Sequence, residues 1–205
     1  MTEEEKGILL VVSGPAGSGK GTVLKELMAK SGDFVYSVSA TTRAPRPGEV
    51  NGVNYHYITS EDFEERIASG GMLEYTRYCD NYYGTPKKEA EEVLESGKNL
   101  ILEIEVEGAE NVKRLYPEAV LIMLLPPSFA VQEARLRGRG TETEEVIKKR
   151  LERTREELPR VSSYDYIVYN HDGGSGKSAD DIIAIVRAEK LRRSRNPDAA
   201  EKYFK

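Results

Sequence analysis

"SGPAGSGKGTV", residues Ser13–Val23, follows an apolar run, "ILLVV" (Ile8–Val12), and leads into a helix-forming stretch, "TVLKELMAK". Gly14, Gly19 and Lys20 have the spacing G-x-x-x-x-G-K of a phosphate-binding loop, in the strand–loop–helix context that this motif requires. Glycines let successive backbone N–H groups turn toward phosphate oxygens, and the helix N-terminus adds positive potential. The stretch therefore predicts a loop that binds the phosphates of a nucleotide, with Lys20 at the terminal phosphates.

The loop departs from the usual motif at one position. Gly21 stands where a serine or threonine hydroxyl would normally meet Mg²⁺, and Thr22 follows it. We therefore expect the metal to be bound more through water and nucleotide than through a protein hydroxyl. A glycine-rich turn without a ligand is the alternative, and the combination of strand, lysine and helix disfavours it.

A second stretch, "HDGGSGKS" (171–178), matches the end of the same motif. Its opening glycine would fall at His171, where a bulky residue makes the tight turn costly. We expect a flexible Gly/Ser connector followed by a helix capped by Ser178 and Asp181.

Apolar runs alternate with helical segments along the chain. This order predicts an α/β fold with a mainly parallel sheet. The expected strands are 8–12, 99–104, 120–125 and 165–170. One expected helix has Thr85 as its N-cap and Gly97 just past its end. The tract from Phe34 to Tyr83 interrupts the alternation and is expected to be an inserted subdomain.

Composition limits the classes of partner. A length of 205 residues indicates a single domain, 1–205. A net charge of −5 disfavours nucleic acid as a partner, and one cysteine fits a reducing compartment. The acidic start does not resemble a secretory signal, and the longest apolar run is too short to span a bilayer. We expect a cytoplasmic protein with no nucleic-acid or membrane partner.

The tract "SVSATTRAPRPGEVNGVNYHYI" carries Arg43 and Arg46 in a segment stiffened by proline. Phenolic donors nearby in the sequence are Tyr55, Tyr57, Tyr82 and Tyr83. Arginine forks and phenols suit a compact dianion such as a monophosphate. The alternative is a surface loop whose arginines meet solvent or nearby carboxylates.

Taken in order, "SGPAGSGKGT", "SVSATTRAPRPGEVNGVNYHY", "LEY" with "NYYGTP", "LEIEVEGA" and "RLRGRGTETEEVIKKRL" resemble the guanylate kinase family. The resemblance runs from Ile8 to about Asn170. It implies a P-loop kinase fold with a core, a GMP-binding subdomain (34–88), and a lid region with its following helix (128–160). It also implies transfer of the γ-phosphoryl group of ATP to GMP with Mg²⁺, giving ADP and GDP, by a monomer or weak homodimer.

The resemblance also implies the site residues. The ATP-binding set is Gly14, Pro15, Ala16, Gly17, Ser18, Gly19, Lys20, Gly21, Thr22 and Asn170. The GMP-binding set is Ser39, Arg43, Arg46, Tyr55, Glu74, Tyr83, Thr85, Glu103 and Glu105. The catalytic set is Lys20, Arg43, Arg46, Arg135, Arg139 and Arg150.

These assignments make chemical sense for guanine. A carboxylate such as Glu74 can accept from N1–H and the 2-amino group, while a hydroxyl such as Ser39 or Thr85 donates to O6. Adenine lacks the N1–H and carries a donor in place of O6, and a site left unpaired in this way discriminates by about 10⁴ or more.

Glu103 and Glu105 are expected on one face at the carboxyl end of a strand, where ligands of parallel sheets bind. By resemblance they face Mg²⁺ and GMP, with Glu103 as the metal residue. A solvated strand end is the alternative. Arginines on a closing lid would stabilise charge on the phosphoryl group in flight and exclude water.

Two other functional classes remain open. A protein-interaction module of the same fold is disfavoured because the phosphate loop and the arginines are all present. A kinase for another phosphorylated substrate, such as a sugar phosphate, is disfavoured by Ser39, Glu74 and Thr85.

Overall fold

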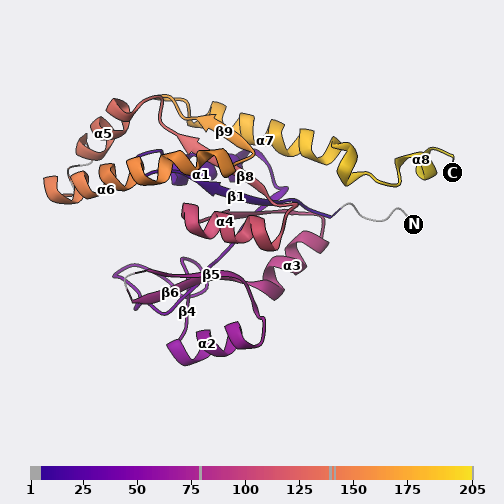
Figure 1. Ribbon diagram of the computed structural model, residues 1–205, viewed down its shortest axis with the longest axis horizontal. Helices are drawn as coiled ribbons and strands as arrows, with labels where there is room; N and C mark the ends of the chain where they lie inside the picture. The colour runs from indigo at the N-terminus through magenta and orange to yellow at the C-terminus, as the bar shows by residue number, and fades with distance from the viewer. Residues whose placement is uncertain (1–5, 79, 139, 141, 205) are drawn as a thin grey trace.

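The computed structural model describes residues 6–204 except Cys79, Arg139 and Thr141. A five-stranded parallel sheet forms its centre, in the order β2-β7-β1-β8-β9 (Figure 1). The strands are β1 (Leu9–Ser13), β2 (Phe34–Tyr36), β7 (Asn99–Glu103), β8 (Val120–Leu125) and β9 (Tyr166–Tyr169). The four apolar runs predicted as strands are confirmed, and so is the parallel α/β sheet. The expected burial of the last strand is wrong, because β9 lies at the edge of the sheet with Ile167 and Tyr169 exposed.

Helices cover both faces of this sheet because its central strands are apolar on both faces. Leu10 and Val12 belong to the core beneath α1 (Lys20–Lys30) and α7 (Ser175–Leu191). Leu9 and Val11 belong to the core beneath α3 (Lys87–Glu95) and α4 (Val106–Leu115). Successive side chains of β1 thus point to opposite faces of the sheet and pack under different helices. The phosphate loop follows β1 and leads into α1.

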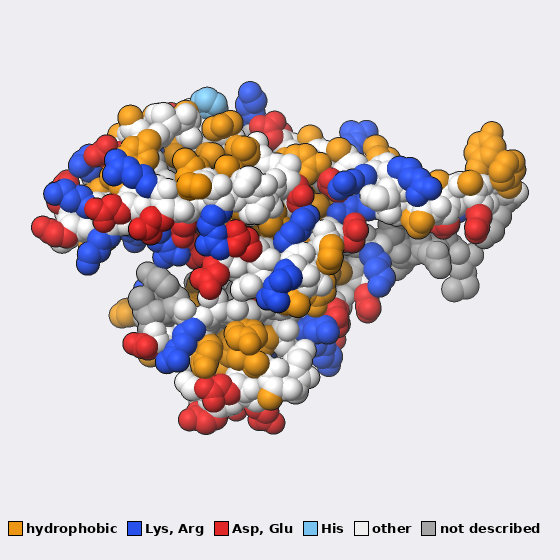
Figure 2. All heavy atoms as spheres, viewed as in Figure 1, with side chains coloured by type: hydrophobic (Ala, Val, Ile, Leu, Met, Phe, Trp, Pro, Cys, Tyr) orange, Lys and Arg blue, Asp and Glu red, His pale blue; other side chains and the backbone are white. Residues whose placement is uncertain are grey.

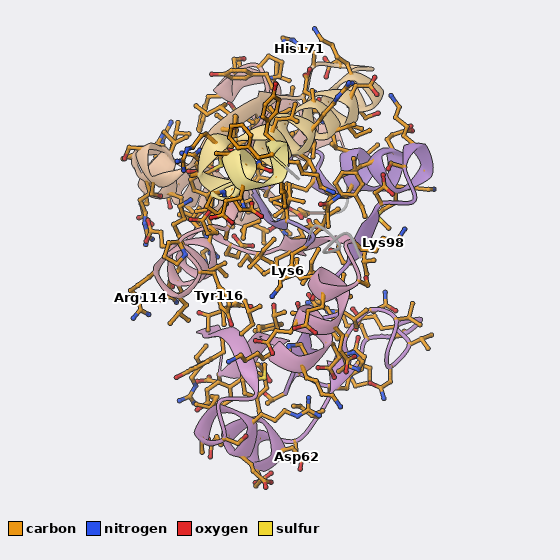
Figure 3. All side chains as sticks on the ribbon, turned by 90° about the vertical axis from the view of Figure 1, so that its right-hand side faces the viewer. Lys6, Asp62, Lys98, Arg114, Tyr116 and His171 are labelled. Atoms are coloured by element: carbon orange, nitrogen blue, oxygen red, sulfur yellow. The ribbon has the colours of Figure 1, made fainter. Side chains whose placement is uncertain are left out.

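A second sheet and one helix form a smaller unit below the core in Figure 1, which we call the small lobe (residues 40–86). Its strand order is β4-β3-β6-β5, and its own core contains Ala40, Phe63 and Met72. The elements are β3 (Ala40–Thr41), β4 (His56–Tyr57), α2 (Ser60–Ala68), β5 (Met72–Tyr78) and β6 (Asn81–Pro86). In Figure 3, Asp62 on α2 lies at the end of the molecule opposite His171.

The expected inserted tract began at Phe34, yet β2 pairs with β7 in the central sheet. Phe34 is buried in the main core, which explains why this short strand stays with the core rather than with the small lobe.

Two antiparallel helices, α5 (Phe129–Gly138) and α6 (Glu144–Glu157), extend from one side of the core, at the left of Figure 1. Their contact is sealed by Leu136, Ile147 and Leu151. The chain then continues through η1 (Leu158–Ser163), which contains Pro159.

The C-terminal segment contains η2 (Arg193–Arg195) and α8 (Ala199–Tyr203), which projects away from the core at the right of Figure 1. In the described part of the chain, no helix has the length and apolar character needed to cross a bilayer.

Two predicted helix starts are wrong. Thr85 belongs to β6, and Pro86 takes the N-cap position of α3. Ser178 lies inside α7, which begins at Ser175, and its hydroxyl donates to the Tyr169 carbonyl at 3.3 Å. In both cases tertiary pairing uses the side chain that the local pattern assigned to a cap.

Candidate active site

The phosphate loop has the backbone shape that its glycines predict. Gly17 and Gly19 have φ of 86° and 88°, a region that favours glycine. A Cβ on Gly14 would lie 2.2 Å from the Leu124 carbonyl, so the loop can leave β1 only by passing close to β8. Gly19 caps α1 without a side-chain hydrogen bond, which leaves the first-turn N–H groups available to an anion.

Side chains behind the loop anchor its carbonyl groups. The Asn170 amide donates to the Ser18 carbonyl at 2.8 Å, and Lys20 Nζ donates to the Gly14 carbonyl at 2.5 Å. The Ser18 hydroxyl and Asn170 Oδ1 are buried, and neither has a hydrogen-bond partner among the described residues. Asn170 thus contacts the loop itself, at the end of β9 where the sequence placed it.

The small lobe gathers part of the predicted monophosphate site. The Arg43 guanidinium lies 5.6 Å from the centre of the Tyr55 ring, and the Tyr55 and Tyr83 rings are 6.1 Å apart. Arg46 is exposed, and its backbone N–H, rather than its side chain, joins the cluster by donating to Glu49 at 2.7 Å.

A carboxylate that the sequence analysis did not single out completes this cluster. Both oxygens of Glu49 accept from the same nitrogen of Arg43 at 3.0 Å, and Tyr57 donates to Glu49 at 2.7 Å. The Arg46 backbone N–H and the Tyr57 hydroxyl are the main reasons that the pKa of Glu49 falls to about 2. Three donor groups make four hydrogen bonds to this one carboxylate, so donors converge at this corner of the lobe.

Neighbouring strands bring the predicted guanine-reading residues together. Glu74 and Thr85 are register partners between β5 and β6, and the Thr85 hydroxyl donates to Glu74 Oε1 at 2.8 Å. The pairing of Ala40 with Gly84 brings Ser39, one residue earlier, level with Thr85. Burial raises the pKa of Glu74 to about 7.

Glu103 and Glu105 do not share a strand face as expected. Glu103 ends β7 and accepts a 2.8 Å hydrogen bond from the Tyr36 phenol, whereas Glu105 is the N-cap residue of α4 and pairs with Arg153 at 3.5 Å. The strand stops after Glu103, so the period of two no longer applies.

A pocket of about 260 Å³ opens beside Glu103, against the first turns of α1. The pocket is lined by Gly21, Leu24, Lys25, Met28, Tyr36 and Glu103. A Cβ on Gly21 would meet nothing within 4 Å, so the missing hydroxyl leaves open space there.

The predicted lid arginines have different surroundings. Arg135 on α5 donates to the Asn170 carbonyl at 2.8 Å and pairs with Asp172 at 2.7 Å. Arg150, near the middle of α6, pairs at 2.8 Å with Glu142, which lies just before that helix. Arg139 lies outside the described residues. Figure 2 shows basic and acidic side chains alternating along α6, above an indentation that separates it from the small lobe.

Sequence reasoning missed Glu49, Tyr57 as a partner of Glu49, and the buried Gln132. Glu49 had a signal, because it follows Arg43 and Arg46 within one turn-forming segment. Gln132 had one too, since an amide stands between Phe129 and Leu136 on the apolar face of α5.

Comparison with known proteins finds similarity to one family over most of the chain. The family model for guanylate kinase matches residues 6–182. A curated guanylate kinase from Halalkalibacterium halodurans is 51% identical over 94% of this chain and 94% of its own length. One from Clostridioides difficile is 48% identical over 98% of this chain and 97% of its own length.

A solved structure points to the same family. The crystal structure of guanylate kinase from Anaplasma phagocytophilum superposes with a TM-score of 0.74 at 30% identity, covering 94% of this chain and 90% of the other. The resemblance seen in the sequence, the P-loop kinase fold and the class of enzyme are confirmed, and the chain belongs to the guanylate kinase family.

Proposed function

We propose that this chain transfers the γ-phosphoryl group of ATP to GMP, giving ADP and GDP, through the residues described above. The observation that carries the proposal is the pairing of a phosphate loop on the core with a buried carboxylate–hydroxyl pair, Glu74 and Thr85, on a separate lobe. A donor nucleotide and an acceptor base would then be bound by different units of the same chain.

On the ATP side, residues Gly14–Thr22 would surround the phosphates. The backbone N–H groups at the start of α1 would bind the phosphate oxygens, and Lys20 would exchange the Gly14 carbonyl for a terminal phosphate. Asn170 and Arg135, which donate to the Ser18 and Gly17 carbonyls, would keep the peptides of the loop oriented.

On the GMP side, ionised Glu74 would accept from the N1–H and 2-amino groups of guanine. Ser39 and Thr85 would supply the hydroxyls that donate to O6, and Thr85 would give up its bond to Glu74 to do so. The register that sets Thr85 between Glu74 and Ser39 supports this assignment. Arg43, Arg46, Tyr55 and Tyr83 would bind the phosphate. Their cluster already contains one carboxylate, so the phosphate would share Arg43 with Glu49.

The residues present fit Mg²⁺ bound mainly by nucleotide and water. Mg²⁺ retains several of its waters in such sites. Among the described residues, no group of three or more His, Cys, Asp or Glu side chains could hold a metal ion. Glu103, at the pocket that Gly21 leaves open, would bind the hydrated ion, which would neutralise phosphate charge.

The region 128–160 would act as a lid, and the small lobe, residues 40–86, as the GMP-binding subdomain within the single domain 1–205. Closure would bring Arg135, Arg139 and Arg150 to the transferring group and would exclude water, so that GMP rather than water accepts the phosphoryl group. A soluble cytoplasmic enzyme, monomeric or a weak homodimer, in purine nucleotide metabolism is the setting that we propose.

The test is product formation from Mg-ATP with and without GMP. We expect ADP and GDP in equal amounts with GMP, and almost no ADP without an acceptor. Protein that binds GMP without turnover would instead be an interaction module. Turnover with a sugar phosphate and not with GMP would favour the other kinase class.

Two matched lysine variants locate the phosphate loop. Lys20→Ala should lower kcat/KM by at least about 100-fold, because it removes the positive charge that would stabilise the transferring phosphoryl group. Lys177→Ala, in the second Gly-Lys-Ser stretch, should leave it unchanged, since Lys177 is exposed on α7. The reverse result would overturn the assignment.

A further inference from the structure

Gln132, on α5, is an uncharged polar side chain buried between the phosphate loop and the lid helices. It is 1% exposed, and its amide nitrogen donates to the Ala16 carbonyl at 2.9 Å and to the Thr154 hydroxyl at 2.8 Å. Thr154, on α6, is 5% exposed and donates in turn to the Arg150 carbonyl at 2.9 Å. One chain of hydrogen bonds thus joins the loop to the helix that carries Arg150.

The direction of each bond in this chain is fixed by chemistry. A backbone carbonyl only accepts, so the group that faces Ala16 has to be the NH₂ of the amide. The Thr154 hydroxyl gives its single proton to the Arg150 carbonyl and accepts from Gln132 through its lone pairs.

The bond to Ala16 determines where the next N–H group points. The peptide that joins Ala16 to Gly17 is trans, so the carbonyl of Ala16 and the N–H of Gly17 point in opposite directions. Gln132 fixes the carbonyl toward α5, which turns the N–H of Gly17 away from α5. In the described part of the chain, no protein oxygen accepts from this N–H.

The surrounding contacts confine the same peptide. A Cβ on Gly17 would lie 3.3 Å from the Gln132 carbonyl and 3.4 Å from the Leu136 side chain, so the loop packs directly on α5. Asn170 has the same effect two residues further along the loop. Its amide holds the Ser18 carbonyl, and this sets the direction of the Gly19 N–H.

We propose that Gln132 is a positioning residue for ATP: it aims the N–H of Gly17 at the phosphates and couples that peptide, through Thr154, to the lid helix α6. The inference rests on the proposed binding of ATP at this loop. An apolar residue at position 132 would leave the partly buried Ala16 carbonyl without the Gln132 amide as its donor.

Four variants test the coupling. Gln132→Leu removes both bonds with little change in size, and Thr154→Val removes the hydroxyl with almost none. Thr154→Ser is the matched control, because it keeps the hydroxyl. The double variant Gln132→Leu/Thr154→Val shows whether the two residues act in one path.

We expect Gln132→Leu to raise the KM for ATP, and the Kd for ADP measured by calorimetry, about tenfold, the effect of one carbonyl left without its donor. Thr154→Val should raise both about threefold, and Thr154→Ser should match the wild type. In the Gln132→Leu background, Thr154→Val should add nothing. The KM for GMP should stay within about twofold throughout, because the small lobe is not involved.

A purely structural role predicts a different pattern. In that case Tm falls while the KM for ATP and the Kd for ADP stay at wild-type values, and the proposal is wrong. If Gln132→Leu does not fold, the comparison of Thr154→Val with Thr154→Ser decides alone. A wild-type protein that does not phosphorylate GMP contradicts the proposed function, whereas normal wild-type turnover with unchanged variants contradicts only this inference.

Discussion

The Glu74 carboxylate accepts a 2.8 Å hydrogen bond from the Thr85 hydroxyl, and both side chains are buried in the small lobe. Burial raises the pKa of Glu74 to about 7 despite this hydrogen bond, which favours the ionised form. A protonated carboxyl group in this position cannot accept from both guanine donors, so the protonation state of Glu74 should control the binding of GMP.

We therefore predict that the KM for GMP depends on pH around neutrality. Below pH 7 the protonated fraction of Glu74 grows, and the KM for GMP should rise about tenfold per pH unit. The KM for ATP should show no matching change. Steady-state kinetics from pH 5.5 to 8.5 measure this.

Glu74→Gln is the control, since it removes the titration of Glu74 while leaving that of the GMP phosphate itself. An identical pH profile in this variant would contradict the assignment of Glu74.

The free energy of unfolding should also depend on the ionisation of Glu74, but a rise in pH that favours GMP binding should lower stability. Because the folded-state pKa is raised from 4.5 to about 7, the folded protein favours protonated Glu74, and stability is lost as pH rises between these values. Glu74→Gln should therefore increase the free energy of unfolding at pH 8, by at most roughly 3 kcal/mol. The difference should vanish near pH 4.5 in denaturant titrations. A variant less stable than wild type at pH 8 would show that the ionised group is stabilised by partners.

Two glycines of the phosphate loop should respond differently to alanine. Gly19→Ala meets a φ of 88° and would place its Cβ 2.4 Å from Asn170 Nδ2, so ATP turnover should fall at least tenfold, and stability with it. Gly21→Ala adds a methyl group to open space in the first turn of α1. It should raise stability by about 0.5 kcal/mol. Thermal unfolding and kinetics of both variants check the pair, and equal damage from each would contradict the loop geometry.

Glu49 should orient Arg43 for the GMP phosphate. Its carboxylate binds one guanidinium nitrogen, while another nitrogen of Arg43 donates to the Ala44 carbonyl at 2.7 Å. Glu49→Gln should raise the KM for GMP by about fivefold, because one charge-assisted contact to Arg43 becomes neutral. The KM for ATP should not change. A lower KM for GMP would mean that Glu49 competes with the phosphate instead.

Local sequence patterns predicted the parts of the fold whose structure is locally determined. The apolar run before Ser13, the loop glycines and the following helix specify one another within about twenty residues, and the structure confirms them. The cap assigned to Thr85 failed because β6 pairs with β5, an interaction that no local pattern contains.

The predicted site was less complete for the same reason. Ser39, Glu74 and Thr85 come together only through the register of three strands, and the family resemblance, rather than any spacing, placed them in one set. Gln132 lies 116 residues from Ala16 along the chain, so its bond to the loop could not be foreseen from either segment.

The central claim is that the small lobe selects guanine for phosphoryl transfer from ATP. The most direct measurement is kcat/KM with Mg-ATP for GMP, IMP and AMP in parallel. IMP keeps N1–H and O6 but lacks the 2-amino group, so we predict the order GMP, IMP, AMP, with AMP about 10⁴-fold below GMP. Comparable turnover of AMP and GMP would contradict the account.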